Sequence, residues 1–310
     1  MILIVTNSSD QTADYLWDRL GPREKDWCRL DTDLAAQHIK VTYEDGVSYL
    51  CVDDRVVKPI DVTGLWYRRP RPVNINGVPS KWSKHSQAEW AEALEGVLVQ
   101  IPFQRWVNHP TANSTASHKL EQLVRSRQLG LPVPKTLVTQ SSAVLQKFWA
   151  ENDGNIICKP LAYGYLDADE PLVIYTSPVS KEHLTTPLLA YCPTMFQERI
   201  DKVLDVRICI IDQTVIAVGL RCTDEQKIDI RRNNMSDVIH GSLDVPNDIS
   251  AKLRTLLHSY KLRFGAIDMV IDRNGGWIFL ELNPNGQWAW LDQIARTDIT
   301  GAMIQALYSH

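Results

Sequence analysis

The chain opens on a run of apolar residues at positions 2–5, which predicts a buried strand. Thr6 to Asp10 follow, and their polar side chains are suited to a loop and to capping the start of a helix. Tyr15, Leu16 and Leu20 then recur with helical spacing. The pattern therefore predicts that the chain begins with a strand followed by a helix.

Short alternating segments continue near residues 39–43, 48–52 and 65–69, and each predicts a further strand. Asn108-His109-Pro110 then marks a break in the pattern. We therefore expect residues 1–108 to form a small α/β domain.

A helix is predicted after this break. Ser114 or Ser117 is expected to cap its start, and Gly130 to end it. Leucine and valine side chains over residues 120–124 give this helix an apolar face, and Lys119 lies in its first turn.

Two apolar strands are predicted next, over residues 156–159 and 172–175, and Lys159 ends the first of them. They complete a central lobe of residues 109–194. The C-terminal lobe, residues 195–310, is predicted to hold strands near 206–211 and 214–219, a helix over 250–260, a hairpin and a final helix. Both lobes are therefore expected to mix helices and strands.

The closing hairpin carries the clearest chemical signal. Asn274-Gly275 between two apolar runs is typical of a two-residue turn. With this turn, Asp268 lies directly opposite Glu281 on the neighbouring strand. Asn283, two residues beyond Glu281, points to the same face and adds an amide oxygen.

Two carboxylates that face one another in a sheet repel unless a positive charge lies between them. Carboxylate and amide oxygens are ligands that suit Mg²⁺. Asp268, Glu281 and Asn283 therefore predict a magnesium site. The alternative for these residues alone is an exposed hairpin face that is acidic without a function.

Other charged residues stand where they can contact phosphates. Lys119 and Lys159, at a helix start and a strand end, can reach a phosphate chain. Asp205 and Arg207 share a strand face, where Arg207 can hold a phosphoryl group or a developing acyl phosphate. Arg231 lies in a polar loop and can clamp a carboxylate. Taken singly, each is equally well explained as a solvated charge or a surface ion pair.

The stretch from Phe196 to Ile200 connects the two lobes. Extended backbone in such a linker can pair with the edge of an adenine base. An ordinary strand is the alternative for this stretch.

Composition excludes several classes of protein. Lys plus Arg number 33 against 37 Asp plus Glu, and this net charge of -4 gives no electrostatic reason to expect a nucleic-acid partner. No apolar stretch approaches the ~18 residues of a membrane span, and the apolar start is too short for a signal peptide. The six cysteines contain no C-x-x-C pair, so reduced thiols in a cytoplasmic enzyme are expected.

Taken in chain order, these charged and amide residues between positions 108 and 290 resemble the signature of ATP-grasp enzymes. In that superfamily the nucleotide lies between two α+β lobes, preceded by a small pre-ATP-grasp α/β domain. The resemblance implies ATP and Mg²⁺ as cofactors. It also implies phosphate contacts for Lys119 and Lys159, adenine contacts for Glu198 and Ile200, further nucleotide-binding positions at Gln197 and Asp205, magnesium ligands at Asp268, Glu281 and Asn283, and catalytic roles for Arg207 and Arg231.

Within the superfamily, the chain most resembles the ribosomal peptide maturases that make graspetides such as microviridins. Such enzymes join Asp or Glu side chains of a precursor peptide to Thr, Ser or Lys side chains. The resemblance implies recognition of a precursor with leader and core segments, and it points to a homodimer. The segments that carry it are residues 65–69, 175–179, 192–198, 229–232 and 281–288.

One departure concerns the cover over the phosphates. Many ATP-grasp enzymes have a glycine-rich segment after the second lysine, whereas residues 160–165 contain a single glycine, Gly164. The maturases share this feature, which supports the narrower resemblance and weakens a nucleotide role for Gly164.

Two other functions remain open from the sequence. One is an intermolecular ligase, similar to the ribosomal-protein glutamate ligase, that adds a free amino acid to a peptide or small acid. The other is a non-catalytic module that binds a nucleotide or peptide and has kept only the fold.

Overall fold

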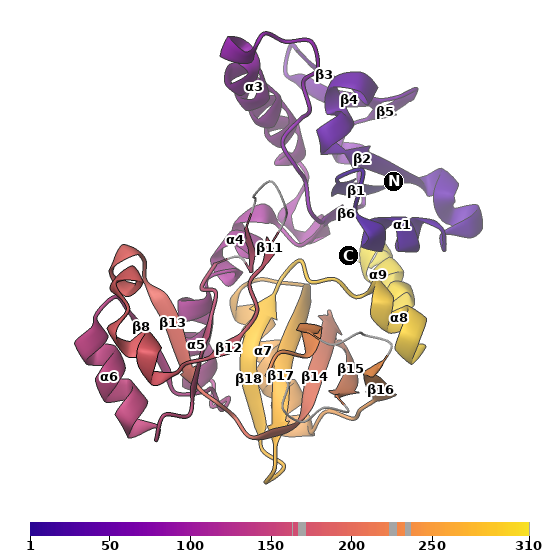
Figure 1. Cartoon of the computed structure of the whole chain (residues 1–310). Helices are drawn as coiled ribbons and strands as arrows, with labels where there is room; N and C mark the ends of the chain where they lie inside the picture. Colours follow the sequence, from indigo (N-terminus) through magenta and orange to yellow (C-terminus); the bar gives the residue numbers. More distant parts are fainter. Residues whose placement is uncertain (163, 167–171, 223–227, 233–236, 310) are drawn as a thin grey trace.

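The structure, a computed structural model, describes residues 1–162, 164–166, 172–222, 228–232 and 237–309. Tyr163 and the acidic segment 167–171, which follow Lys159 in the sequence, lie outside the described residues. Helices and strands mix in an N-terminal domain, a central lobe and a C-terminal lobe (Figure 1). The predicted mixture of helices and strands is confirmed.

Parallel strands in the order β2-β1-β6-β7 form the main sheet of the N-terminal domain, and β3-β4-β5 form a second, antiparallel sheet. The apolar opening is the fully buried strand β1, and Asp10 caps helix α1 by accepting the Thr12 amide at 3.1 Å. The domain comprises β1 (Ile2–Thr6), α1 (Gln11–Trp17), β2 (Trp27–Asp31), α2 (Ala35–His38), β3 (Ile39–Glu44), β4 (Val47–Val52), β5 (Arg55–Val57), β6 (Gly64–Tyr67), α3 (Ser80–Leu98) and β7 (Trp106–Val107).

The central lobe contains a sheet in the order β12-β9-β13-β8 and a separate pair, β10-β11. Its strand β13 was predicted to open the C-terminal lobe, but it is hydrogen-bonded between β8 and β9. The lobe comprises α4 (Pro110–Ala116), α5 (Lys119–Gln128), β8 (Thr136–Thr139), α6 (Ser142–Glu151), β9 (Ile156–Lys159), β10 (Tyr165–Leu166), β11 (Leu172–Val173), β12 (Ser177–Pro178) and β13 (Thr194–Glu198).

The predicted start of the helix that carries Lys119 is wrong in one respect. Ser114 lies inside the separate helix α4, and Ser117 lies just past the end of α4, so neither serine caps α5. His118 stands at the N-cap position without a side-chain hydrogen bond. Lys119 is nevertheless the first residue of α5, and Gly130 follows the helix with a φ of +73°.

The C-terminal lobe is built on an antiparallel sheet in the order β16-β15-β14-β17-β18. One face of this sheet packs on α7, whose Leu253, Leu256 and Leu257 are buried against Ile208 and Ile267. The lobe comprises β14 (Lys202–Ile211), β15 (Thr214–Arg221), β16 (Ile239–Ser242), α7 (Asn247–Ser259), β17 (Phe264–Asp272), β18 (Trp277–Asn283), α8 (Ala289–Ala295) and α9 (Ile299–Tyr308).

The hydrophobic core crosses the boundary between the N-terminal domain and the C-terminal lobe. Helices α8 and α9 lie against α1 and β6 (Figure 1), and one cluster joins Ile4 and Leu16 to Phe264, Trp288 and Leu307. In the central lobe, α6 and the sheet of β9 and β13 share a small core of their own, whereas Ala112 and Ala116 of α4 belong to the core of the C-terminal lobe. Within the described ranges, no helix is long and apolar enough to cross a membrane.

Candidate active site

A cleft of about 1060 Å³ lies between the central and C-terminal lobes. Strands β9 and β13 contribute to one side, and strands β14, β17 and β18 to the other. Arg69 of the N-terminal domain reaches the same cleft. All the residues predicted for nucleotide, metal or catalytic roles line it: Lys119, Lys159, Gln197, Glu198, Ile200, Asp205, Arg207, Arg231, Asp268, Glu281 and Asn283.

The facing carboxylates are present, because Asp268 on β17 pairs directly with Glu281 on β18. The predicted two-residue turn, however, is wrong. The Asp272 amide donates to Gly276 O at 3.0 Å, so three residues form the loop, and Gly275 adopts the left-handed conformation with a φ of +80°.

A bulge restores the pairing that this longer loop shifts. Near the loop, Met269 pairs with Phe279, one position away from the predicted register. The register shifts again between Asp268 and Met269, which leaves Leu280 as an extra residue on β18. Two deviations from a regular hairpin therefore cancel, and the carboxylates meet.

Each carboxylate is held by a cation from another element. Arg207 Nη1 on β14 donates to Asp268 Oδ1 at 2.7 Å, and Lys119 Nζ lies 3.1 Å from Glu281 Oε2. Burial raises the pKa of Asp268, although Arg207 opposes this effect. Burial also raises the pKa of Glu281, but Lys119 and Lys159 outweigh it and hold that pKa below its usual value.

Asn283 completes the predicted metal ligands. Its Oδ1 accepts the Asn285 amide at 3.1 Å, which directs the side chain toward its own loop. Among the described residues, no group of three or more His, Cys, Asp or Glu side chains is arranged to hold a metal. The donor set here contains two carboxylates and an amide, and one oxygen of Asp268 and one of Glu281 accept no protein hydrogen bond in the described part of the chain. Such a set fits Mg²⁺ that keeps water and phosphate oxygens among its ligands.

Two lysines face the carboxylates from the central lobe. Lys119 Nζ also donates to Pro160 O at 2.9 Å, so it bridges this loop and the C-terminal lobe. Lys159 makes no ion pair within the described ranges, and burial lowers its pKa to about 8. Both side chains therefore concentrate positive charge on one wall of the cleft.

The linker residues are already partly engaged. Gln197 Nε2 donates to Thr136 Oγ1 at 2.9 Å in the lobe interior, and a Glu198 carboxylate oxygen accepts the Lys135 amide at 2.8 Å. The Ile200 amide, in contrast, donates no hydrogen bond to any described residue. Of the three predicted contacts, Ile200 alone offers a backbone donor that is ready for a ligand.

Asp229 holds Arg231 in place. Arg231 Nε and Nη2 donate to the two Asp229 oxygens at 2.8 and 2.5 Å, and the Asp229 carboxylate also accepts the Thr176 amide. Burial raises the pKa of Asp229, but its bonds with Arg231 and Thr176 hold that pKa below its usual value. A substrate carboxylate must therefore use the remaining Nη1 of Arg231 or displace Asp229.

Sequence reasoning gave no role to several cleft residues. Lys202 Nζ donates to Asp205 Oδ1 at 2.7 Å, which neutralises that carboxylate. Arg69 lies in the loop after the parallel strand β6 and reaches across to the C-terminal lobe. Ligands commonly bind at the carboxyl ends of parallel strands, and this rule was the available signal for Arg69.

Comparisons with known proteins agree with this architecture. The family model of the MvdD pre-ATP-grasp domain matches residues 1–114. Among curated protein sequences, none matches the chain significantly.

Solved structures match over nearly the whole chain. Macrocyclase MdnC from Microcystis aeruginosa MRC, bound with precursor peptide MdnA, is 28% identical with a TM-score of 0.84 over 99% of both chains. An ATP-grasp ligase from Chryseobacterium gregarium, in complex with ADP and a leader and core peptide, is 23% identical with a TM-score of 0.87 over 99% of this chain and 96% of that chain. The ATP-grasp ligase PsnB, complexed with minimal precursor, Mg and ADP, is 23% identical with a TM-score of 0.77 over 99% and 96%. The N-terminal domain is therefore of the MvdD pre-ATP-grasp type, and over nearly its whole length the chain is similar to ATP-grasp enzymes that act on ribosomal peptides, such as macrocyclase MdnC.

Proposed function

We propose that the protein uses ATP and Mg²⁺ to activate side-chain carboxylates of a ribosomally made precursor peptide, and joins them to hydroxyl or amino groups of the same peptide. One observation supports this most directly. A single cleft gathers a facing carboxylate pair with lysines and arginines from both lobes. Two enzymes that share the fold are bound to peptides: macrocyclase MdnC to the precursor peptide MdnA, and the C. gregarium ATP-grasp ligase to a leader and core peptide.

Different charged and polar groups of the cleft have different roles in this proposal. Lys119 and Lys159 face the position for the phosphates, and the Ile200 amide is the donor for an adenine edge. Asp268, Glu281 and Asn283 are the residues that would hold Mg²⁺, and the bound ion supplies positive charge that offsets the charge on the phosphates. Lys119 is able to leave Glu281 for a phosphate oxygen, since it is a flexible side chain with a single ion pair.

The reaction proceeds in two displacement steps. A peptide carboxylate oxygen attacks the γ-phosphorus of ATP, and the bond between the γ-phosphorus and the β,γ-bridging oxygen breaks. ADP departs, and an acyl phosphate remains on the peptide. A hydroxyl or amino group then attacks the acyl carbon and gives up its proton, and phosphate departs. Arg207, which is hydrogen-bonded to Asp268, stabilises the negative charge that develops on the acyl and phosphate oxygens.

The narrower assignment concerns the product. We propose that the product belongs to the graspetide class that includes microviridins. Residues 65–69 and 281–288, which carried this resemblance, meet in the structure, where Trp66 stacks on Trp288 at 6.0 Å between ring centroids.

We also propose that the protein is a homodimer, which size-exclusion chromatography with light scattering tests. A cytoplasmic location is proposed because ATP is supplied there.

The test combines the protein, ATP, Mg²⁺ and a short peptide that is encoded beside its gene and rich in Thr and Glu. Mass spectrometry should show loss of one or more waters from the peptide, with ADP formed in proportion. A peptide that gains the mass of an amino-acid residue would instead identify an intermolecular ligase. Failure to form ADP above background would leave only a binding module. Asp268→Asn serves as the inactive control.

A further inference from the structure

The loop after β18, residues 283–287, begins at the proposed metal ligand Asn283. It is tightly turned, because the Gly286 amide donates to Asn283 O at 3.2 Å and the Asn285 amide donates to Asn283 Oδ1. The position of the Asn283 side chain therefore depends on the position of the whole loop.

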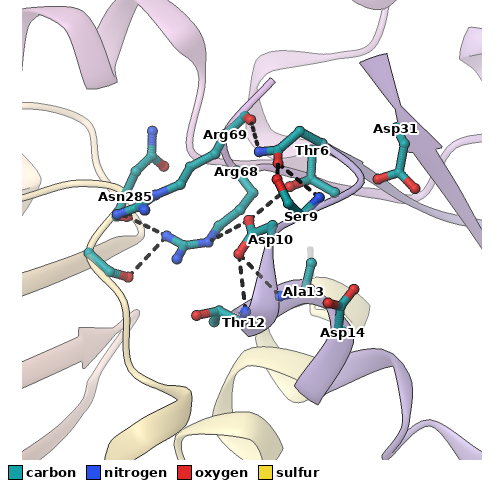
Figure 2. Close-up of polar contacts among 12 residues, drawn as sticks. Thr6, Ser9, Asp10, Thr12, Ala13, Asp14, Asp31, Arg68, Arg69 and Asn285 are labelled. Carbon is teal, nitrogen blue, oxygen red and sulfur yellow. Dashed lines mark hydrogen bonds and ion pairs between the residues drawn. The ribbon is translucent and has the colours of Figure 1, made fainter. Parts of the chain in front are cut away.

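Two arginines of the N-terminal domain bind the carbonyl groups of this loop (Figure 2). Arg68 Nη1 donates to Asn285 O and, at 3.0 Å, to Gly286 O. Arg69 Nε and Nη2 donate to Asn285 O at 3.2 and 3.1 Å. Residues more than 200 positions apart in the sequence are thus joined beside the cleft.

Asp10 fixes the orientation of Arg68. Its Oδ2 lies 3.3 Å from Arg68 Nε, and both side chains are almost completely buried. The same carboxylate accepts the Thr6 hydroxyl at 2.8 Å and the amides of Thr12 and Ala13 at the start of α1 (Figure 2). Hydrogen bonds within the N-terminal domain therefore fix the position of Asp10, and Asp10 in turn restricts where the Arg68 guanidinium can lie.

Stability alone does not explain this buried pair. Removing an arginine and a carboxylate from water is costly, and apolar residues of similar volume often serve stability as well or better. Arg68 Nε and Nη2 have no hydrogen-bond partner in the described part of the chain, so Asp10 meets Arg68 as an ion pair only. Burial lowers the pKa of Arg68 to about 9, although Asp10 opposes this effect.

Arg207 contacts the same loop at the next residue. Its Nη2 donates to Gln287 O at 3.2 Å. A Cβ at Gly286 would lie 2.3 Å from Ala266 Cβ and 2.7 Å from Arg207 Nη2, so the loop backbone is in close contact there. Three arginines therefore bind consecutive carbonyl groups of the loop, Arg68 and Arg69 from the N-terminal domain and Arg207 from β14.

From this geometry we infer that Arg68, oriented by Asp10, is a positioning residue. It fixes the position of the 283–287 loop relative to Arg207 and thereby the position of the Asn283 side chain. The N-terminal domain then forms part of the metal–nucleotide site. This inference rests on the proposed function, because it takes Asn283 as a ligand of the metal.

The experiment measures metal binding directly. Mn²⁺ is titrated into the full-length protein in the presence of excess ADP, and free Mn²⁺ is followed by electron paramagnetic resonance. Arg68→Lys keeps the charge but loses the planar fork. Asp10→Asn keeps the shape and the ability to cap α1 but loses the charge. Leu30→Ala, a buried change in β2 of the same domain, is the control for lost stability.

We expect Arg68→Lys and Asp10→Asn to weaken Mn²⁺ binding about 10- to 100-fold, as for groups that orient metal ligands. Leu30→Ala should lower the melting temperature and leave Mn²⁺ affinity unchanged. If Arg68→Lys does not fold, Asp10→Asn decides the matter. Wild-type Mn²⁺ affinity in the folded variants, or equal weakening in Leu30→Ala, overturns the positioning role. A wild-type protein that binds no Mn²⁺ with ADP overturns the proposed metal site, and the inference with it.

Discussion

At the scale of single residues, the two facing carboxylates differ in their partners. Arg207 holds Asp268, whereas Lys119 and Lys159 both act on Glu281. Their charges are therefore balanced by cations before any metal binds. A metal that enters must compete with those cations or share the carboxylates with them.

The first prediction concerns these carboxylates. Asp268→Asn and Glu281→Gln should each reduce ADP formation in the presence of precursor about 100-fold or more, because each removes a carboxylate that we propose binds the metal. Asp268→Asn should also lower the melting temperature, because Arg207 loses its charged partner. Steady-state assays and thermal melts check both effects, and undiminished ADP formation in either variant would remove the metal assignment.

The second prediction concerns the pH dependence of Lys159, whose pKa burial lowers from 10.5 to about 8. Between these values the unfolded chain binds more protons than the native one, so this lysine makes the free energy of unfolding rise with pH across that window. A phosphate favours the protonated lysine, so ATP binding near pH 8 should take up a proton.

Calorimetry in two buffers of different ionisation enthalpy measures this uptake. The apparent binding enthalpy should differ between the buffers for the wild type and not for Lys159→Arg, which stays charged throughout. Identical enthalpies in the wild type would show that Lys159 does not meet the phosphates.

At the scale of elements, the β17–β18 hairpin keeps the predicted pairing of Asp268 with Glu281 although its loop is one residue longer than predicted. The three-residue loop shifts the register by one position, and the bulge at Leu280 shifts it back. Bulges commonly re-aim side chains next to functional sites. Here the bulge brings Asp268 and Glu281 together.

The third prediction compares two glycines near this hairpin. A Cβ added at Gly275 would have no atom within 4 Å, but an alanine there would have to adopt the left-handed backbone conformation, with a φ of +80°. Gly275→Ala should cost about 1–2 kcal/mol of stability and leave ADP formation unchanged. Gly286→Ala places a Cβ 2.7 Å from Arg207 Nη2.

We expect Gly286→Ala to displace Arg207 and reduce ADP formation at least tenfold. Thermal melts and ADP assays on both variants separate the two effects. Equal activity in the two variants would mean that the loop tolerates the extra methyl group without moving Arg207.

The helix that carries Lys119 shows where local signals fail. Ser114 and Ser117 are both good capping residues. The chain nevertheless forms the short helix α4 first and begins α5 at Lys119 without a side-chain cap. Contacts of buried Ala112 and Ala116 with the C-terminal lobe favour α4, and the sequence does not display those contacts.

At the scale of the whole molecule, the distribution of hydrophobic cores sets which parts unfold together. Leu16 is buried in the cluster shared by the N-terminal domain and the C-terminal lobe, whereas Leu145 belongs to the small core of the central lobe. Both leucines are almost fully buried. Regions with a separate core open independently of the rest.

The fourth prediction uses this matched pair. Leu16→Ala and Leu145→Ala should each cost about 2–5 kcal/mol. Leu16→Ala should increase hydrogen exchange in both the N-terminal domain and helices α8 and α9. Leu145→Ala should increase it only in the part of the central lobe that shares the core of Leu145, which is α6 with β9 and β13. Mass spectrometry after proteolysis resolves these regions, and a uniform increase in both variants would show that the molecule has one cooperative core.

The sequence by itself determined the kinds of groups and much of their order. Apolar runs defined strands such as β1 and β9, because strand periodicity depends on nearby residues. The sequence also predicted that Asp268 faces Glu281, but the chain reaches that pairing through a three-residue loop and a bulge and not through the predicted two-residue turn. The residue types at the predicted positions also indicated oxygen ligands and phosphate contacts.

Only the tertiary structure decided the rest. Lys119 meets Glu281, Arg207 meets Asp268, and Arg68 meets the 283–287 loop through contacts between distant parts of the chain. Such contacts depend on how separate lobes pack, which no local pattern encodes. The charge state of each group depends in turn on burial and on those partners. The kinds of side chain that line the cleft were therefore predictable from the sequence, and their electrostatic balance was not.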